Sequence, residues 1–220
     1  MQTRLSDPQH ALYIDFESEQ DGPPILLGVL GRHAALGDDD DFRQYIFDET
    51  LQPAGAARPT THGACHAVNP LEALCRLRRA AESAAMPILA WSSHEQTTIE
   101  CIVESTGDAA FWQGQVVDAK KLAKLWKRTA YPDVVFPLTR GSGRHALRHY
   151  LTLIEYPIPT TQQGGLTGQR IRAVRDAMTK RQVFESLTPT QKRKWRSLLE
   201  HNWHDCNGLR ELMLRVTRQP

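Results

Sequence analysis

Hydrophobic positions in the first quarter of the chain fall in short segments of five or six residues, as is typical of β-strands. Three short segments carry this pattern, at 11–16, 25–30 and 43–47. Their close spacing predicts an antiparallel meander of three strands. The acidic run at 38–41 is expected to form a turn between the second and third strands.

From residue 70 onward, apolar residues recur at helical spacing, interrupted by short apolar segments. The pattern predicts helices at 70–85, 93–105 and 119–129 and strands at 86–91 and 116–118. In the third helix, Leu122, Leu125 and Trp126 are expected to face the core. A meander followed by alternating helices and strands predicts an α/β fold, with a mixed sheet flanked by helices in a single domain over 1–220.

The last third of the chain is predicted to be largely helical. Ser142 is a candidate cap for a helix carrying Leu147, Tyr150, Leu151 and Ile154, and a basic helix is expected at 170–186. Thr188, Pro189 and Gln191 form a helix-start signal, with a cap, a proline at the first position and a capping-box partner. That final helix is expected to run to about Arg218, with a break near Asn202.

Composition places the chain among ordinary globular proteins. Among its 220 residues, 40% are apolar and 24% are charged. No apolar run reaches the roughly 18 residues of a membrane span, and the first ten residues lack the apolar core of a signal peptide. The four cysteines lack paired spacing, which favours a reducing cytoplasm over a disulfide scaffold.

Charge is distributed unevenly along the chain. Residues 139–220 contain 15 Lys and Arg against 6 Asp and Glu, whereas residues 1–138 contain 12 against 19. A basic C-terminal third beside an acidic remainder suggests a polyanionic partner. The alternative is an uneven solvated surface without a partner.

Asp15 and Glu17 are the first candidates for chemistry. In a strand at 11–16 and just beyond it, Leu12, Ile14 and Phe16 would share one face and the two acids the other. Adjacent carboxylates repel each other unless a cation lies between them, and Mg²⁺ prefers oxygen ligands. The alternative is a pair of ordinary surface acids at a strand end.

Two further acids follow later strands. Glu95 lies in the first turn of the helix after the strand at 86–91, at the sheet edge where open α/β sheets place their sites. Ser92 and Glu95 also match a capping box, so Glu95 could serve only as a cap. Asp118 ends the strand at 116–118, where it is expected to cap the next helix.

Asp205 and His201 lie four residues apart and would share one face of a continuous helix. Beside a metal ion, such a pair could bind the ion and activate water. In the alternative, Asn202 caps a new helix, Asp205 lies in its first turn and His201 belongs to a loop.

The order of these acids resembles that of the DEDD superfamily of 3′-to-5′ exonucleases. The segments DFESE, LLGVL and YIFD are similar to the first motif and its two following strands, ILAWSSHEQTTIECI to the second motif, and HNWHDCNGLREL to the third. Between them, VVDAKKLAKLWKR and GSGRHALRHYLTLIEYPIP resemble intervening family segments. The resemblance spans about 11–216. The branch of YprB-type ribonuclease-H-like domains also has Glu at the position of Glu95, where the superfamily usually has Asp.

The resemblance implies an RNase H-like sheet and a 3′-5′ exonuclease that acts on ends of DNA or RNA. By position, Asp15, Glu17, Glu95 and Asp205 would bind two divalent ions, Mg²⁺ or Mn²⁺, about 4 Å apart with Asp15 shared. His201 stands where one subgroup has Tyr and would be the fifth catalytic residue. Added Mn²⁺ is then expected to raise the stability of the fold.

Basic residues supply candidate contacts to nucleic acid. Spacing by four suggests a cationic stripe of Arg140, Arg144 and Arg148, and two other helices carry similar groups. The remaining candidates are Lys120, Lys121, Lys124, Arg170, Arg172 and Arg175. Such residues would neutralise phosphates, so binding would weaken with salt. Two other readings stay open: a catalytically silent module that binds nucleic acid or protein, and an α/β interaction protein whose acids are caps and surface groups.

Overall fold

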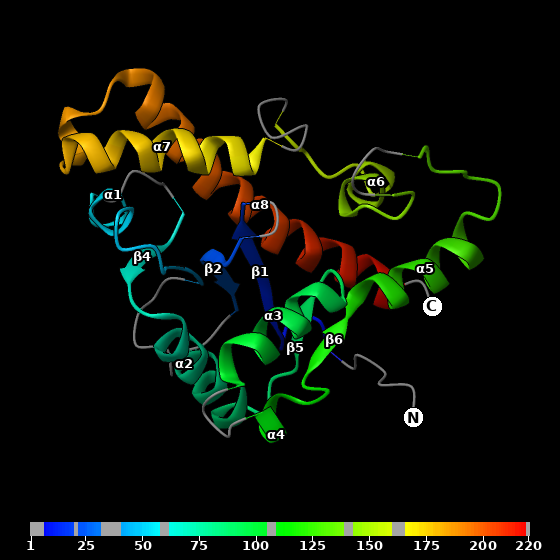
Figure 1. Cartoon of the computed structure of the whole chain (residues 1–220). Coiled ribbons are helices and arrows are strands. Elements are labelled where there is room, and N and C mark those ends of the chain that lie inside the picture. Colours follow the sequence, from blue (N-terminus) through cyan, green and yellow to red (C-terminus); the bar gives the residue numbers. More distant parts are fainter. Residues whose placement is uncertain are drawn as a thin grey trace.

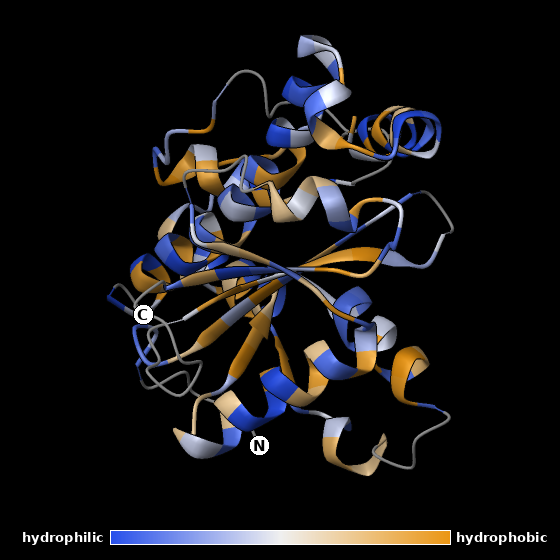
Figure 2. Cartoon of the chain, turned by 90° about the vertical axis from the view of Figure 1, so that its left-hand side faces the viewer, coloured by the Kyte–Doolittle hydropathy of each residue, from blue (hydrophilic) through white to orange (hydrophobic). Residues whose placement is uncertain are grey.

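A six-stranded mixed sheet lies at the centre of the chain, with helices on both of its faces (Figures 1 and 2). The computed structural model describes residues 7–19, 22–31, 41–57, 62–104, 109–138, 143–159 and 166–218. In these parts the strand order is β4-β3-β2-β1-β5-β6. The strands are β1 (Leu12–Ser18), β2 (Pro24–Leu30), β3 (Phe42–Ile46), β4 (Ala64–Ala67), β5 (Ile88–Ala90) and β6 (Val116–Asp118).

The predicted meander is confirmed, because β1 pairs antiparallel with β2 and β2 antiparallel with β3. The predicted strands β5 and β6 extend the sheet on the other side of β1, both in parallel. Sequence analysis missed β4, which pairs parallel to β3 at the opposite edge. The acidic run at 38–41 lies outside the described residues except for Asp41.

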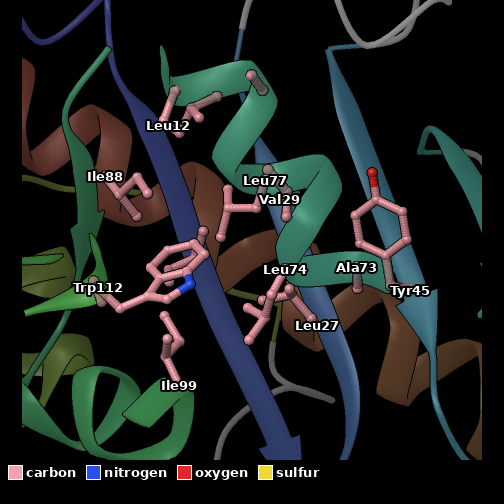
Figure 3. Close-up of a cluster of buried hydrophobic side chains, with 14 of the residues drawn as sticks. Leu12, Leu27, Val29, Tyr45, Ala73, Leu74, Leu77, Ile88, Ile99 and Trp112 are labelled. Carbon is pink, nitrogen blue, oxygen red and sulfur yellow. The ribbon is translucent and has the colours of Figure 1, made fainter. Parts of the chain in front are cut away.

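One face of the sheet is covered by α2 (Pro70–Ser83), α3 (Ser93–Val103) and α4 (Ala109–Trp112). Leu12 and Ile14 of β1 point to this face, where they meet Leu74 and Leu77 of α2 and Trp112 (Figure 3). Phe16 packs against the same cluster. The predicted alternation of β1 is therefore correct, and the acids between these apolar residues lie on the other face.

The other face is covered by α8 (Pro189–Arg218) together with shorter helices, and α8 crosses β1 and β2 (Figure 1). The shorter helices are α1 (Gln52–Ala56), α5 (Ala119–Ala130), α6 (Leu147–Leu153) and α7 (Thr167–Arg181). A short 3-10 turn, η3 (Phe184–Ser186), follows α7, so the helix predicted at 170–186 ends at Arg181.

The predicted capping box at the start of α8 is present. The backbone N–H of Thr188 donates to Oε1 of Gln191 over 2.9 Å, and the backbone N–H of Gln191 donates to Oγ1 of Thr188 over 3.3 Å. The predicted break near Asn202 is wrong, since α8 is continuous over 30 residues, about 45 Å. Gly208 lies within α8 where α6 packs closely against it. A Cβ atom at this position would lie 2.7 Å from a methyl group of Leu151.

Two expectations about the helices need correction. Leu125 was predicted to face the core, but it is 46% exposed, and Ala119, Ala123 and Trp126 form the buried side of α5. Helix α6 begins at Leu147, with Ala146 at its N-cap position and no side-chain cap. Ser142, the predicted cap, lies outside the described residues.

Candidate metal centre

Strand β1 places Asp15 and Glu17 side by side, facing α8. Glu17 is only 6% exposed, and its Oε1 atom is buried without a hydrogen-bond partner in the described structure. A buried carboxylate oxygen without a partner is costly, because burial removes its water and supplies nothing in return. This atom is therefore the clearest sign in the structure that a cation belongs here.

Helix α8 brings His201 and Asp205 to the same place. One turn apart on the continuous helix, they approach each other to 3.6 Å between Nε2 and Oδ2. The alternative in which Asn202 begins a new helix is thereby excluded. One ligand atom from each of Glu17, His201 and Asp205 lies within 4.8 Å of the other two, so the group could hold a metal ion.

Asn202 fixes the position of Asp15. Its Nδ2 atom donates to the backbone carbonyl of Asp15 over 3.0 Å and to the carboxylate Oδ2 of Asp15 over 2.9 Å. Its Oδ1 atom accepts from Nε2 of Gln44 over 3.1 Å, and Gln44 also donates to the carbonyl of Leu199 over 3.0 Å. Asn202 is fully buried, so these bonds hold α8 in register over β1.

Gly28 leaves the space that Asn202 occupies. Asp15, Gly28 and Gln44 are cross-strand neighbours on β1, β2 and β3, and Asn202 lies over this row. A Cβ atom on Gly28 would lie 2.2 Å from Oδ1 of Asn202. Sequence analysis missed this support. The available signal was a polar Asn at a sheet-facing position of an otherwise apolar helix side.

Glu95 has the capping role that was one of the two predicted for it. It closes the predicted capping box of α3, where the backbone N–H and the Oγ hydroxyl of Ser92 both donate to its Oε2 over 3.1 Å. It is also 6% exposed, and its charge contributes to raising the pKa of Asp15, so it lies near the acids of β1. Asp118 acts as predicted, capping α5 through a bond from the Lys121 N–H over 3.2 Å.

Burial and mutual repulsion raise the pKa values of the clustered acids. Burial raises the pKa of Asp15 well above its usual range, and the charges of Glu17, Asp205 and Glu95 raise it further. Burial raises the pKa of Glu17 to about 7, opposed by the nearby charges of His201 and Arg170. The pKa of His201 is raised, mainly by Asp205. Concentrated negative charge of this kind favours a cation.

Several predicted phosphate-binding residues have other partners. Arg175 pairs with Glu19 and, over 2.6 Å, with Asp48, and Arg172 pairs with Glu19 over 3.3 Å. Lys121 pairs with Asp118 over 3.8 Å. The ion pairs of Arg172 and Arg175 join α7 to the loops at the carboxyl ends of β1 and β3, so both arginines have a structural role, and their contact with phosphates stays a prediction.

The predicted stripe of Arg140, Arg144 and Arg148 does not form as one helical face. Only Arg148 lies on α6, Arg144 precedes the helix, and Arg140 lies outside the described residues. Arg170 lies in the first turns of α7, and its charge influences the pKa values of Glu17 and His201. Among the described arginines predicted from sequence, Arg170 is therefore the one whose charge acts on Glu17 and His201.

The helices within the described ranges include none with the length and apolar composition to cross a bilayer. In comparisons with protein-family models, curated proteins and solved structures, no match to this chain was found.

Proposed function

We propose that this chain is a metal-dependent nuclease that removes nucleotides from the 3′ ends of single-stranded nucleic acid. The observation that carries the proposal is the approach of Glu17, His201 and Asp205 to within 4.8 Å of one another, with Oε1 of Glu17 buried and unpartnered in the described structure. Asp15 and Glu95 are close enough for the charge of Glu95 to act on Asp15. These residues come from three elements far apart in the sequence. A structural role explains only part of this arrangement, because capping satisfies Glu95 and leaves the other buried acids repelling one another.

The sheet supports the same proposal. An antiparallel meander followed by two parallel strands on the far side of β1 agrees with the RNase H-like sheet that the sequence resemblance implies. The acids lie at the carboxyl ends of β1 and β5 and on the helix that crosses β1. A fold alone does not determine a function, so the proposal depends mainly on the residues of the site.

Each residue of the site would have a separate role in the reaction. Asp15 is held by Asn202 and Glu95 by Ser92, so both carboxylates are oriented before any ligand binds. Two divalent ions bound there would lower the pKa of a water molecule and offset charge on the leaving oxygen. His201 Nε2 lies 3.6 Å from Oδ2 of Asp205. In its deprotonated form this imidazole would accept a proton from the attacking water. Arg170 brings a positive charge to the same end of the sheet.

Cleavage of 5′-labelled DNA and RNA strands tests the proposal. With Mn²⁺ or Mg²⁺ we expect a ladder that shortens from the 3′ end, and with EDTA no products, because the acids alone cannot activate water. A 3′-labelled strand should release its label as a mononucleotide from the first time point.

Two results would contradict the proposal. Binding of the strands without metal-dependent cleavage would indicate a catalytically silent nuclease-like module. Neither binding nor cleavage would indicate an α/β interaction protein in which the acids have no catalytic role.

A further inference from the structure

Helix α5 presents a row of lysines on one side. Ala119, Ala123 and Trp126 form the buried side of the helix. Lys120, Lys124 and Lys127 follow one another at four and three residues, so they share an adjacent side. Among the described residues, none of these three lysines forms an ion pair with an acid, whereas Lys121 pairs with Asp118.

This lysine side faces a second group of basic residues before and within α6. Lys127 Nζ lies 5.8 Å from the ring centroid of Phe136, and that ring lies 6.2 Å from the ring of His145 and 5.3 Å from that of His149. Burial lowers the pKa of His145, and the charges of Lys124, Lys120 and Lys127 lower it further. The same three lysines all act on His145, so the lysine side of α5 lies toward the residues that precede and begin α6.

The lysine side begins next to the acid cluster. The backbone N–H of Lys120 donates to the carbonyl of Trp91 over 3.1 Å, and Trp91 directly precedes Ser92, the residue bonded to Glu95. The Trp91 ring packs on Tyr150 at 5.2 Å, and the Tyr150 hydroxyl is hydrogen-bonded to Nδ1 of His145 over 2.7 Å. From Lys120 to Lys127 the row extends about 10 Å along α5.

We propose that Lys120, Lys124 and Lys127 bind the phosphates of a single-stranded nucleic acid whose 3′ end lies at the acid cluster. The inference rests on the proposed function, and it names the surface that holds the substrate. The acid cluster by itself repels the phosphates of a strand. The three lysines, which have no acidic partner among the described residues, would supply the binding energy that the acid cluster lacks. Such contacts are independent of base sequence, so DNA and RNA would both be held.

Two double variants with the same change of charge test the inference. Lys124→Ala/Lys127→Ala removes two lysines of the row, and Arg193→Ala/Arg196→Ala removes two exposed cations from the first turns of α8. Binding of fluorescein-labelled oligothymidylate and oligouridylate is followed by anisotropy in EDTA over a series of salt concentrations. EDTA prevents cleavage, so the readout does not depend on the nuclease activity.

For the first variant we expect about tenfold weaker binding, and a fall of about 1.4 in the slope of log affinity against log salt. The control variant should change affinity by less than about twofold. Equal weakening by both variants, or absence of strand binding by the native protein, would overturn the inference. The inference would also be overturned if an acidic peptide competed with the strands for the protein and bound it with the same affinity.

Failure of the proposed function gives a different pattern. If the native protein binds strands through Lys124 and Lys127 but never cleaves them with Mn²⁺, the binding surface stands and the nuclease proposal fails. If it cleaves them and the first variant binds normally, only the inference about the lysine row fails.

Discussion

Replacing Glu17 by Gln is expected to lower metal-dependent cleavage by at least about a thousandfold. Glutamine keeps the size of the side chain but removes the charge of the carboxylate whose Oε1 is buried without a partner in the described structure. A loss of roughly 4 kcal/mol of transition-state stabilisation corresponds to three powers of ten in rate. Single-turnover cleavage of a labelled strand measures the change. Glu104→Gln, at an exposed position after α3, is the matched control and should cleave at the native rate.

The same variant is expected to be more stable than the native protein when metal is absent. The pKa of Glu17 is about 7 in the folded protein and 4.5 for the free side chain. At pH values between these two pKa values, Glu17 keeps its proton in the folded state but has released it in the unfolded state. The free energy of unfolding of the native protein therefore falls as the pH rises from about 4.5 to 7. Gln does not titrate and avoids this loss, which is about 3 kcal/mol for a shift of this size. Urea unfolding in EDTA at pH 5 and pH 8 measures it, and an advantage for Gln at pH 5 that equals the one at pH 8 would contradict the expectation.

Replacing Gly28 by Ala is expected to destabilise the fold by about 1–3 kcal/mol and to weaken metal binding by about tenfold. The added methyl would meet Asn202 at 2.2 Å, so either the side chain of Asn202 or the whole of α8 must shift. Either movement breaks the bonds that hold Asp15. Urea unfolding gives the stability, and calorimetric titration with Mn²⁺ gives the affinity.

Gly22→Ala is the control for this prediction. A Cβ atom there meets its nearest neighbour at 3.5 Å, an ordinary van der Waals contact, so stability should change by less than about 0.5 kcal/mol. Native stability and native Mn²⁺ affinity in Gly28→Ala would show that Asn202 can move without affecting Asp15. The support assigned to Asn202 would then be wrong.

Local patterns predicted the fold where they were periodic and bounded by clear signals. The meander follows from three short, closely spaced apolar segments, and α2, α3 and the start of α8 follow from helical spacing and capping residues. Alternation along the first of these segments predicted that Asp15 and Glu17 would share a face, because side-chain direction in a strand is fixed by the backbone. The approach of α8 to β1 depends on contacts between distant segments, which spacing alone does not specify.

Where local preference and tertiary contacts disagree, sequence analysis went wrong. Asn202, Asn207 and Gly208 disfavour a helix interior, yet α8 continues through all three. The bonds from Asn202 to Asp15 and the close packing of Gly208 on Leu151 outweigh that preference. The spacing of basic residues along the sequence also does not show which of them form ion pairs with acidic residues. Arg172 and Arg175 bind Glu19, an acid 153 to 156 residues earlier in the chain.

Anomalous diffraction from crystals soaked in Mn²⁺ tests the central claim most directly, because it locates the ion without relying on activity. We expect an anomalous peak within about 2.2 Å of Oε1 of Glu17, bounded by Asp15 and Asp205, and no such peak in Glu17→Gln. A second peak about 4 Å away would give the two-ion arrangement. Ordered Asp15, Glu17 and Asp205 side chains without an anomalous peak among them would contradict the assignment of this cluster as a metal centre.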